Sequence, residues 1–258
     1  MSELRVENLS KQFGGVRAVD DVSFTLSGGG IHALIGPNGA GKTTLFNLIS
    51  GRVRPSGGQV LFDGDLITGL PAHRVAAKGI VRTFQLVRLF KKMSVADNVA
   101  VGCHLATRGG VAAALLRPAW SVRQEREVAT YAREMLELVG LHDAEGQLAG
   151  HLTYGHQRLL EIARAVAARP RLLLLDEPAA GLNAEETARL ADIISTIAAR
   201  GIDVLLIEHD MELVMRVAAR VIVLDFGRKI ADGPPDEVSR DPSVLTAYLG
   251  GAQDVADA

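Results

Sequence analysis

The sequence has one cysteine, no long apolar run and almost no net charge, and each of these features excludes a class of protein. Cys103 has no second cysteine for a disulfide or a multi-cysteine metal site, so we expect a reducing compartment and a buried apolar role. The N-terminus has no signal-peptide hydrophobic region, and the longest apolar run, residues 111–116, is far below the ~18 residues of a membrane span. The net charge of −2 gives no sign of a general nucleic-acid binder.

What is present fits a globular protein of some size. The chain has 258 residues, of which 48% are hydrophobic and 22% are charged. These values are typical of soluble proteins. The length allows one large domain, or a core with a sizeable inserted lobe.

A glycine-rich segment, residues 36–43, reads Gly-Pro-Asn-Gly-Ala-Gly-Lys-Thr and follows an apolar run, Ile31–Ile35. Its glycines let the backbone turn tightly and aim N–H groups inward, toward the positive end of a helix that begins near Lys42. Lys42 then reaches the β and γ phosphates of a nucleotide, and the Thr43 hydroxyl ligates Mg²⁺. The residues expected to surround the phosphates are Gly36, Pro37, Asn38, Gly39, Ala40, Gly41, Lys42, Thr43 and Thr44.

Two later apolar runs also end in polar residues. The run at residues 172–175 is followed by Asp176 and Glu177. Parallel-sheet sites lie where strands end, so Asp176 can hold Mg²⁺ through water and Glu177 can accept a proton from an attacking water. An isolated Asp-Glu pair would instead be read as a solvated strand end. The run at 204–207 ends before His209, which can contact the γ-phosphate, or can be a surface residue or helix cap.

A second candidate anion site lies more than 100 residues after the first. Residues 152–157 read Leu-Thr-Tyr-Gly-His-Gln and open a predicted helix. Thr153 supplies a capping hydroxyl and Gly155 a bare backbone N–H, which together can hold an anion or simply cap the helix.

The pattern along the chain predicts three parts. Short β segments before residue 88 form an antiparallel layer, and helical periodicity over residues 89–170 indicates an inserted helical lobe. From residue 171, fully apolar strands alternate with helices, which favours a parallel sheet covered on both faces. We therefore expect one domain over residues 1–252, with 1–88 and 171–252 as its core, and a tail at 253–258.

Together these motifs resemble the ATP-binding-cassette (ABC) ATPases over essentially the whole chain. The matches, in the family's order, are the Walker A loop at residues 36–43, the Q-loop Gln85, the ABC signature at 152–157, the Walker B strand at 172–177 and the switch His209. The resemblance implies an α/β fold: a P-loop NTPase (RecA-like) core with a parallel sheet, an N-terminal antiparallel β layer and an inserted α-helical subdomain.

The resemblance also implies a mechanism. Two subunits close head to tail around ATP and Mg²⁺, and the signature of one caps the nucleotide held by the other. Phe13 stacks on adenine, unless it is a core aromatic. The catalytic residues are Lys42, Gln85, Glu177 and His209. The residues at the metal are Thr43, Gln85 and Asp176. Signature residues Thr153, Gly155 and His156 and the D-loop residue Asn183 complete the nucleotide site.

Finer features resemble the ATP-binding subunits of branched-chain amino-acid importers. They are residues 13–15, 81–85, 88–90, 106–126, 179–183 and 247–250. This implies permease subunits in separate chains, a periplasmic binding protein acting indirectly, no nucleic acid, and a cytoplasmic place on the inner face of the membrane. The alternatives are an ABC ATPase for urea or amides or for lipid, or one outside transport. Tyr154, His156 and Asn183 depart from the commoner family residues, and a protonated His156 is expected to attract the partner's γ-phosphate.

Overall fold

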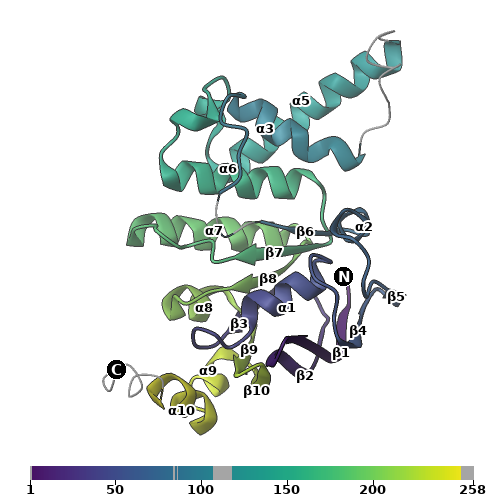
Figure 1. The fold of residues 1–258 in the computed structure, drawn as a ribbon. Helices are drawn as coiled ribbons and strands as arrows, with labels where there is room; N and C mark the ends of the chain where they lie inside the picture. The colour runs from purple at the N-terminus through teal and green to yellow at the C-terminus, as the bar shows by residue number, and fades with distance from the viewer. Residues whose placement is uncertain (1, 84, 86, 107–117, 251–258) are drawn as a thin grey trace. The chain divides into compact units, whose positions relative to one another are not determined.

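The chain divides into two units in the computed structural model, and the first of them contains two sheets with a helix packed between them (Figure 1). The structure describes residues 2–83, 85, 87–106 and 118–250. The first unit comprises Met1–Arg82, Arg171–Ala180 and Ile197–Ala258, and the second comprises Thr83–Pro170 and Gly181–Thr196. The predicted boundaries at residues 88 and 171 remain a prediction.

A six-stranded sheet carries the strands that were predicted to end at polar residues. Its order is β10-β9-β3-β8-β7-β6, and neighbours from β9 to β6 run parallel. Every residue of the three central strands is buried, as their apolar runs predict. The strands are β3 (Ile31–Ile35), β6 (Ile80–Arg82), β7 (Leu172–Asp176), β8 (Asp203–Ile207), β9 (Arg220–Asp225) and β10 (Arg228–Gly233).

The edge strand β10 was not expected from the sequence. It pairs antiparallel with β9 through a turn in which Phe226 and Gly227 both have positive φ, 42° and 79°. Its sequence, Arg-Lys-Ile-Ala-Asp-Gly, mixes polar and apolar residues that are at best half-buried, so it lacks the apolar run that marked the other strands. An edge strand needs no such run, because it has a neighbouring strand on only one edge and is less buried than the central strands.

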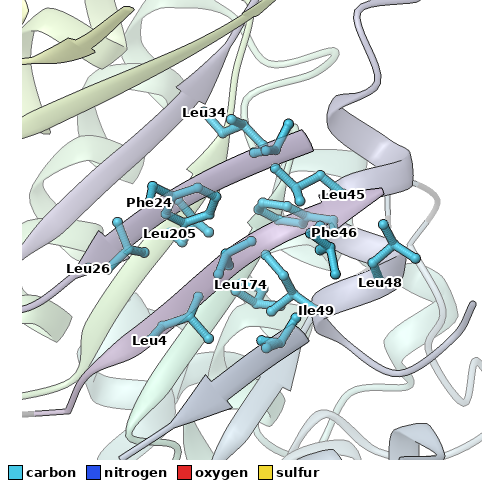
Figure 2. Packing of buried hydrophobic residues seen from close by; sticks show 14 of the residues in the cluster. Leu4, Phe24, Leu26, Leu34, Leu45, Phe46, Leu48, Ile49, Leu174 and Leu205 are labelled. Carbon is cyan, nitrogen blue, oxygen red and sulfur yellow. The ribbon is translucent and has the colours of Figure 1, made fainter. Parts of the chain in front are cut away.

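The predicted antiparallel layer is present with longer strands than expected. Its order is β2-β1-β4-β5, and β1 and β2 form a long hairpin around Gly14. Helix α1 (Lys42–Ile49) buries Leu45, Phe46, Leu48 and Ile49 in a core that also takes residues from both sheets (Figure 2). The strands are β1 (Leu4–Phe13), β2 (Val16–Leu26), β4 (Gly57–Phe62) and β5 (Asp65–Leu66).

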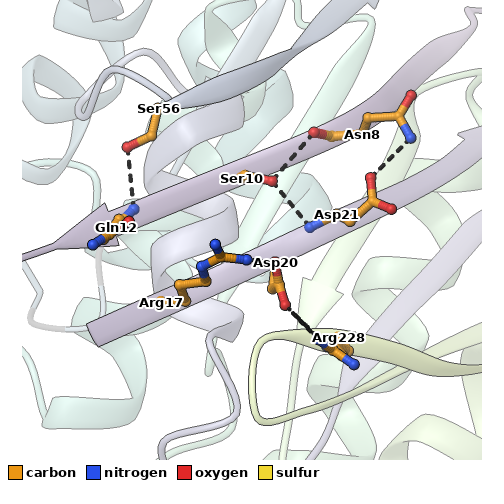
Figure 3. Close-up of polar contacts among 8 residues, drawn as sticks. All are labelled: Asn8, Ser10, Gln12, Arg17, Asp20, Asp21, Ser56 and Arg228. Atoms are coloured by element: carbon orange, nitrogen blue, oxygen red, sulfur yellow. Dashed lines mark hydrogen bonds and ion pairs between the residues drawn. The ribbon is translucent and has the colours of Figure 1, made fainter. Parts of the chain in front are cut away.

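Polar contacts fasten β10 to this layer (Figure 3). The Arg228 guanidinium lies 2.8 Å from an Asp20 carboxylate oxygen, and Arg17 donates to the other oxygen at 3.1 Å. The hydrogen bond from Arg228, helped by Arg17, holds the pKa of Asp20 below its usual value even though burial opposes the shift. The backbone adds a hydrogen bond from Asp20 N to Gly227 O at 2.8 Å.

The first unit contains further short helices, and the second unit is helical. The first unit has α2 (Ala72–Ala77), α8 (Met211–Val217), α9 (Pro235–Val238) and α10 (Pro242–Gly250). The second has α3 (Val95–Gly102), α5 (Ala119–Val139), α6 (Tyr154–Ala167), and 3₁₀ turns η1 (Cys103–Ala106), η2 (His142–Ala144) and η3 (Ala149–His151). Helix α7 (Ala184–Ala199) begins in the second unit and ends in the first.

Several expectations for the second unit can be checked. Cys103 is buried, as predicted, and burial raises the pKa of its thiol. The helix predicted at 121–139 is α5, which ends at Gly140 in the left-handed conformation. The apolar run 111–116, most of the segment 106–126 and the tail 253–258 lie outside the described residues. In the part of the chain that the structure describes, no helix combines the length and apolarity needed to cross a bilayer.

Candidate nucleotide-binding and hydrolysis site

The polar residues that follow β3, β7 and β8 meet at one edge of the sheet. These strands are parallel neighbours in the order β3-β8-β7, so their carboxyl ends point the same way. The phosphate loop, residues 36–43, follows β3, Glu177 follows β7 and His209 follows β8. Ligand sites of open parallel sheets lie at this edge.

Two glycines of the phosphate loop are required by close backbone contacts. Gly36 has φ 145°, and a Cβ there would lie 2.1 Å from the Leu224 carbonyl oxygen. Gly41 has φ 98°, and its Cβ would lie 2.2 Å from the carbonyl oxygen of Ala18 in β2. Gly227 N also donates to Ala40 O at 3.0 Å. The loop therefore packs against β9, β2 and the β9–β10 turn, and these contacts fix the direction of its backbone amides.

Lys42 begins α1 and turns its ammonium back into the loop. Its Nζ donates to Gly36 O at 2.7 Å and to Pro37 O at 2.9 Å, and the residue is only 5% exposed. Burial lowers the pKa of Lys42, while the charge of Glu177 opposes the shift. A buried cation at a helix N-terminus, beside loop amides, suits a polyphosphate.

The residues predicted for Mg²⁺ in this unit offer a suitable donor set. Thr43 is exposed in the first turn of α1, and Asp176 is the last residue of β7. Mg²⁺ prefers oxygen ligands and takes few of them from protein, because it keeps waters and binds substrate phosphates. A hydroxyl and a carboxylate beside a phosphate loop therefore fit this ion.

Glu177 and His209 form a close pair. His209 Nε2 lies 3.1 Å from Glu177 Oε1. Glu177 adopts the left-handed conformation, with φ 47°. This conformation is strained for any residue other than glycine. A carboxylate in contact with an imidazole can receive a proton from water and remain oriented while it does so.

Phe13 is a surface aromatic residue, and its predicted stacking on adenine remains a prediction. It ends β1 and is 49% exposed, so it is not a core aromatic. Lys11 Nζ lies 4.9 Å from the ring centroid, a cation–π contact that leaves the ring on the surface.

The second candidate anion site, in the helical unit, is a capped helix start with a carboxylate beside it. The Thr153 hydroxyl accepts from His156 N at 3.3 Å, so Thr153 is the cap of α6. A Cβ on Gly155 would lie 2.5 Å from Glu186 Oε1. Asn183 N donates to Glu186 at 3.0 Å and Glu186 N donates to Asn183 Oδ1 at 2.9 Å, a capping box at the start of α7. The signature-like and D-loop-like segments are therefore neighbours in this unit.

Comparison with known proteins shows the family of the chain. Residues 19–180 match the family model described as ABC transporter. This chain belongs to the ABC transporter family. Residues 228–254 also match the model described as branched-chain amino acid ATP-binding cassette transporter.

Relatives within the ABC transporter family are similar over nearly the whole chain. The branched-chain amino acid transport ATP-binding protein BraF of Pseudomonas aeruginosa is 46% identical to this chain. The match covers 96% of this chain and 98% of the length of BraF. LivG of Escherichia coli K12, with the same description, is 43% identical over the same shares. The ADP conformation of MJ1267, an ATP-binding cassette of an ABC transporter, has a TM-score of 0.83 at 33% identity, covering 97% of this chain and 99% of that one.

Tyr154, which differs from the glycine commoner in the ABC family, contacts other residues of the helical unit. A Cβ on Gly181 would lie 3.1 Å from the Tyr154 ring, so the ring packs on the segment before Asn183. The Tyr154 hydroxyl accepts from Arg158 Nη2 at 3.1 Å, and Arg158 Nη2 also donates to Gln85 O at 2.9 Å. Gln85 lies in the helical unit, and its predicted roles at the metal and in catalysis remain predictions.

Sequence reasoning missed Arg82, the last residue of β6, whose side chain is only 7% exposed. Its Nη2 donates to Asp176 Oδ2 at 2.7 Å, and its Nη1 donates to Asn47 Oδ1 at 2.8 Å on α1. It thus links β7 to α1, the helix that follows the phosphate loop. In the sequence, Arg82 is a single basic residue within an apolar run. Nothing in that pattern indicates that it pairs with Asp176, 94 residues later.

Proposed function

We propose that the chain binds and hydrolyses ATP at the edge formed by β3, β7 and β8, as the ATPase subunit of a transporter. The observation that carries this proposal is the meeting of the phosphate loop, Asp176, Glu177 and His209 within one unit. The Glu177–His209 contact at 3.1 Å also argues against a module that holds ATP without hydrolysing it.

Each residue has a role that follows from its position. Loop amides and Lys42 bind the phosphates and offset the charge that develops on the transferring phosphoryl group. Glu177 orients a water and takes its proton, while His209 holds the Glu177 carboxylate and contacts the γ-phosphate. Thr43 and Asp176 would hold Mg²⁺, which neutralises phosphate charge when bound.

The substitution Glu177→Gln tests the hydrolytic role. It removes the base and leaves the phosphate loop intact, so ATP binding should persist while steady-state phosphate release falls by about 100-fold or more. Fluorescent-nucleotide titration and a phosphate-release assay measure the two quantities. As a control, Glu212→Gln changes an exposed carboxylate in α8 and should leave both unchanged. A Glu177→Gln chain that turns over near the normal rate would assign the base to another residue.

We further propose that the transporter imports branched-chain amino acids. The support is the similarity to BraF and LivG and the C-terminal match at residues 228–254. In this proposal the chain sits on the cytoplasmic face of the membrane, pairs with a second ATPase subunit, identical or paralogous, and docks on separate permease subunits. A periplasmic binding protein delivers the solute.

Candidate permease contacts lie after Gln85. Phe90 is 50% exposed, whereas Val87 and Leu89 are only partly exposed, and Leu86 lies outside the described residues. Co-purification from membranes identifies the other chains, and ATPase activity of the reconstituted complex with leucine-loaded binding protein tests the solute. Stimulation by urea, an amide or a lipid instead would replace branched-chain amino acids as the cargo.

A further inference from the structure

Glu208 is a buried carboxylate for which the proposed hydrolysis mechanism has no use. It follows the last residue of β8, stands between Ile207 and His209, and is 3% exposed. Burial raises the pKa of Glu208, and hydrogen bonds from the backbone of Ala179, His209 and Asp210 oppose the shift. A buried carboxyl needs compensating partners, so its contacts indicate what it holds.

Its two oxygens bind the backbone of two different loops. Oε1 accepts from Ala179 N at 2.8 Å, in the loop that follows β7 and carries Glu177. Oε2 accepts from His209 N at 3.1 Å, in the loop that follows β8. One side chain therefore bridges the backbones that carry the two ends of the Glu177–His209 contact.

The loop after β7 needs such support. Glu177 has φ 47°, a conformation that persists only where surrounding contacts impose it. Glu177 N donates to Ile207 O at 3.0 Å, and Ala180 N donates to Glu177 O at 3.2 Å. Glu208 adds the Ala179 contact between these two, so the turn is held at successive points.

We propose that Glu208 is a positioning residue for ATP hydrolysis, whose carboxylate sets the separation of Glu177 and His209 by holding both loops. The inference rests on the proposed ATPase function. Glu208 touches no reacting atom in this scheme and acts through Glu177. Its loss should therefore reduce turnover, because a displaced base is an ineffective one, and should spare nucleotide affinity, which depends on the phosphate loop.

The test compares Glu208→Gln with Asp203→Asn in the full-length chain. Glutamine is nearly isosteric but turns an NH₂ group toward one of the two backbone N–H groups. We expect kcat for ATP to fall about 10- to 100-fold with KM and nucleotide affinity within about twofold of wild type. Asp203, also a buried carboxylate, begins the same strand and accepts from Ser2 N at 3.1 Å, so its substitution should lower stability and leave kcat unchanged.

A second comparison separates positioning from a merely structural role. In a Glu177→Gln background, Glu208→Gln should lower the residual rate no further, because the group it positions is already gone. If Glu208→Gln yields too little folded protein, Glu208→Asp replaces it, since aspartate keeps the charge but withdraws both oxygens by one methylene.

Three results would overturn the inference: unchanged kcat in the Glu208 variant, a loss no larger than that of Asp203→Asn, or full multiplication of the two effects in the double variant. Wild-type protein that releases no phosphate would instead contradict the proposed function itself.

Discussion

His32 shows how one side chain makes the stability of the sheet depend on pH. It lies in the central strand β3 and is buried. Burial lowers the pKa of His32, nearby Arg220 lowers it further, and Asp203 and Asp232 oppose the shift. The folded state therefore resists protonation more than the unfolded chain does.

We expect this histidine to cost stability in mild acid. Above the unfolded pKa, 6.5, neither state carries the proton, and the contribution of His32 is fully present. As pH falls below 6.5 the unfolded chain takes up the proton first, so the free energy of unfolding decreases. Urea unfolding at pH 7.5 and 5.5 measures the decrease, and His32→Gln should lessen it. An identical decrease in that variant would show that other groups cause it.

At the scale of elements, the phosphate loop depends on glycine for two separable reasons. Gly36 and Gly39 both have positive φ, but a Cβ at Gly36 would lie 2.1 Å from Leu224 O, whereas one at Gly39 would meet nothing within 4 Å. Gly39→Ala should therefore cost only backbone strain, about 1–2 kcal/mol. Gly36→Ala should cost more than about 4 kcal/mol and displace the loop from the sheet.

Chemical denaturation of both variants measures these costs, and nucleotide titration shows whether the loop still binds. The two alanine substitutions change the same residue type in the same loop, so each serves as the other's control. Equal losses would mean that strain, and not the contact with Leu224, makes glycine necessary at position 36.

Elements were predictable where their signal is local. Strands β3, β7 and β8 were predicted because each is an apolar run that stops at a glycine-rich turn or at polar residues. The Thr153 cap was predicted because a hydroxyl precedes a helical pattern. Strand β10 was missed because its mixed sequence has no apolar run and acquires its structure by pairing with β9. The joint role of Arg82 and the bridging by Glu208 were missed because each needs a partner brought close only by folding.

At the scale of the whole molecule, each of the two units joins segments that lie far apart in the sequence. Residues 181–196, which follow the Walker B strand, join the helical unit, where Asn183 and Glu186 lie beside Gly155. The signature-like and D-loop-like segments thus share one unit, and the phosphate loop, Glu177 and His209 share the other. The family resemblance assigns these two sets to opposite sides of each ATP, contributed by different subunits.

This division predicts that two defective chains can complement one another. Lys42→Ala should disable the phosphate loop. Gly155→Asp should place a Cβ against Glu186 Oε1 and a negative charge at the segment that we expect to face phosphate, so each variant alone should hydrolyse almost no ATP. In a mixed dimer, one site combines the intact phosphate loop of the Gly155→Asp chain with the intact signature of the Lys42→Ala chain. Phosphate release should therefore reappear on mixing and rise with protein concentration. A mixture as inactive as its components, or a monomeric chain with full activity, would contradict a site shared between subunits.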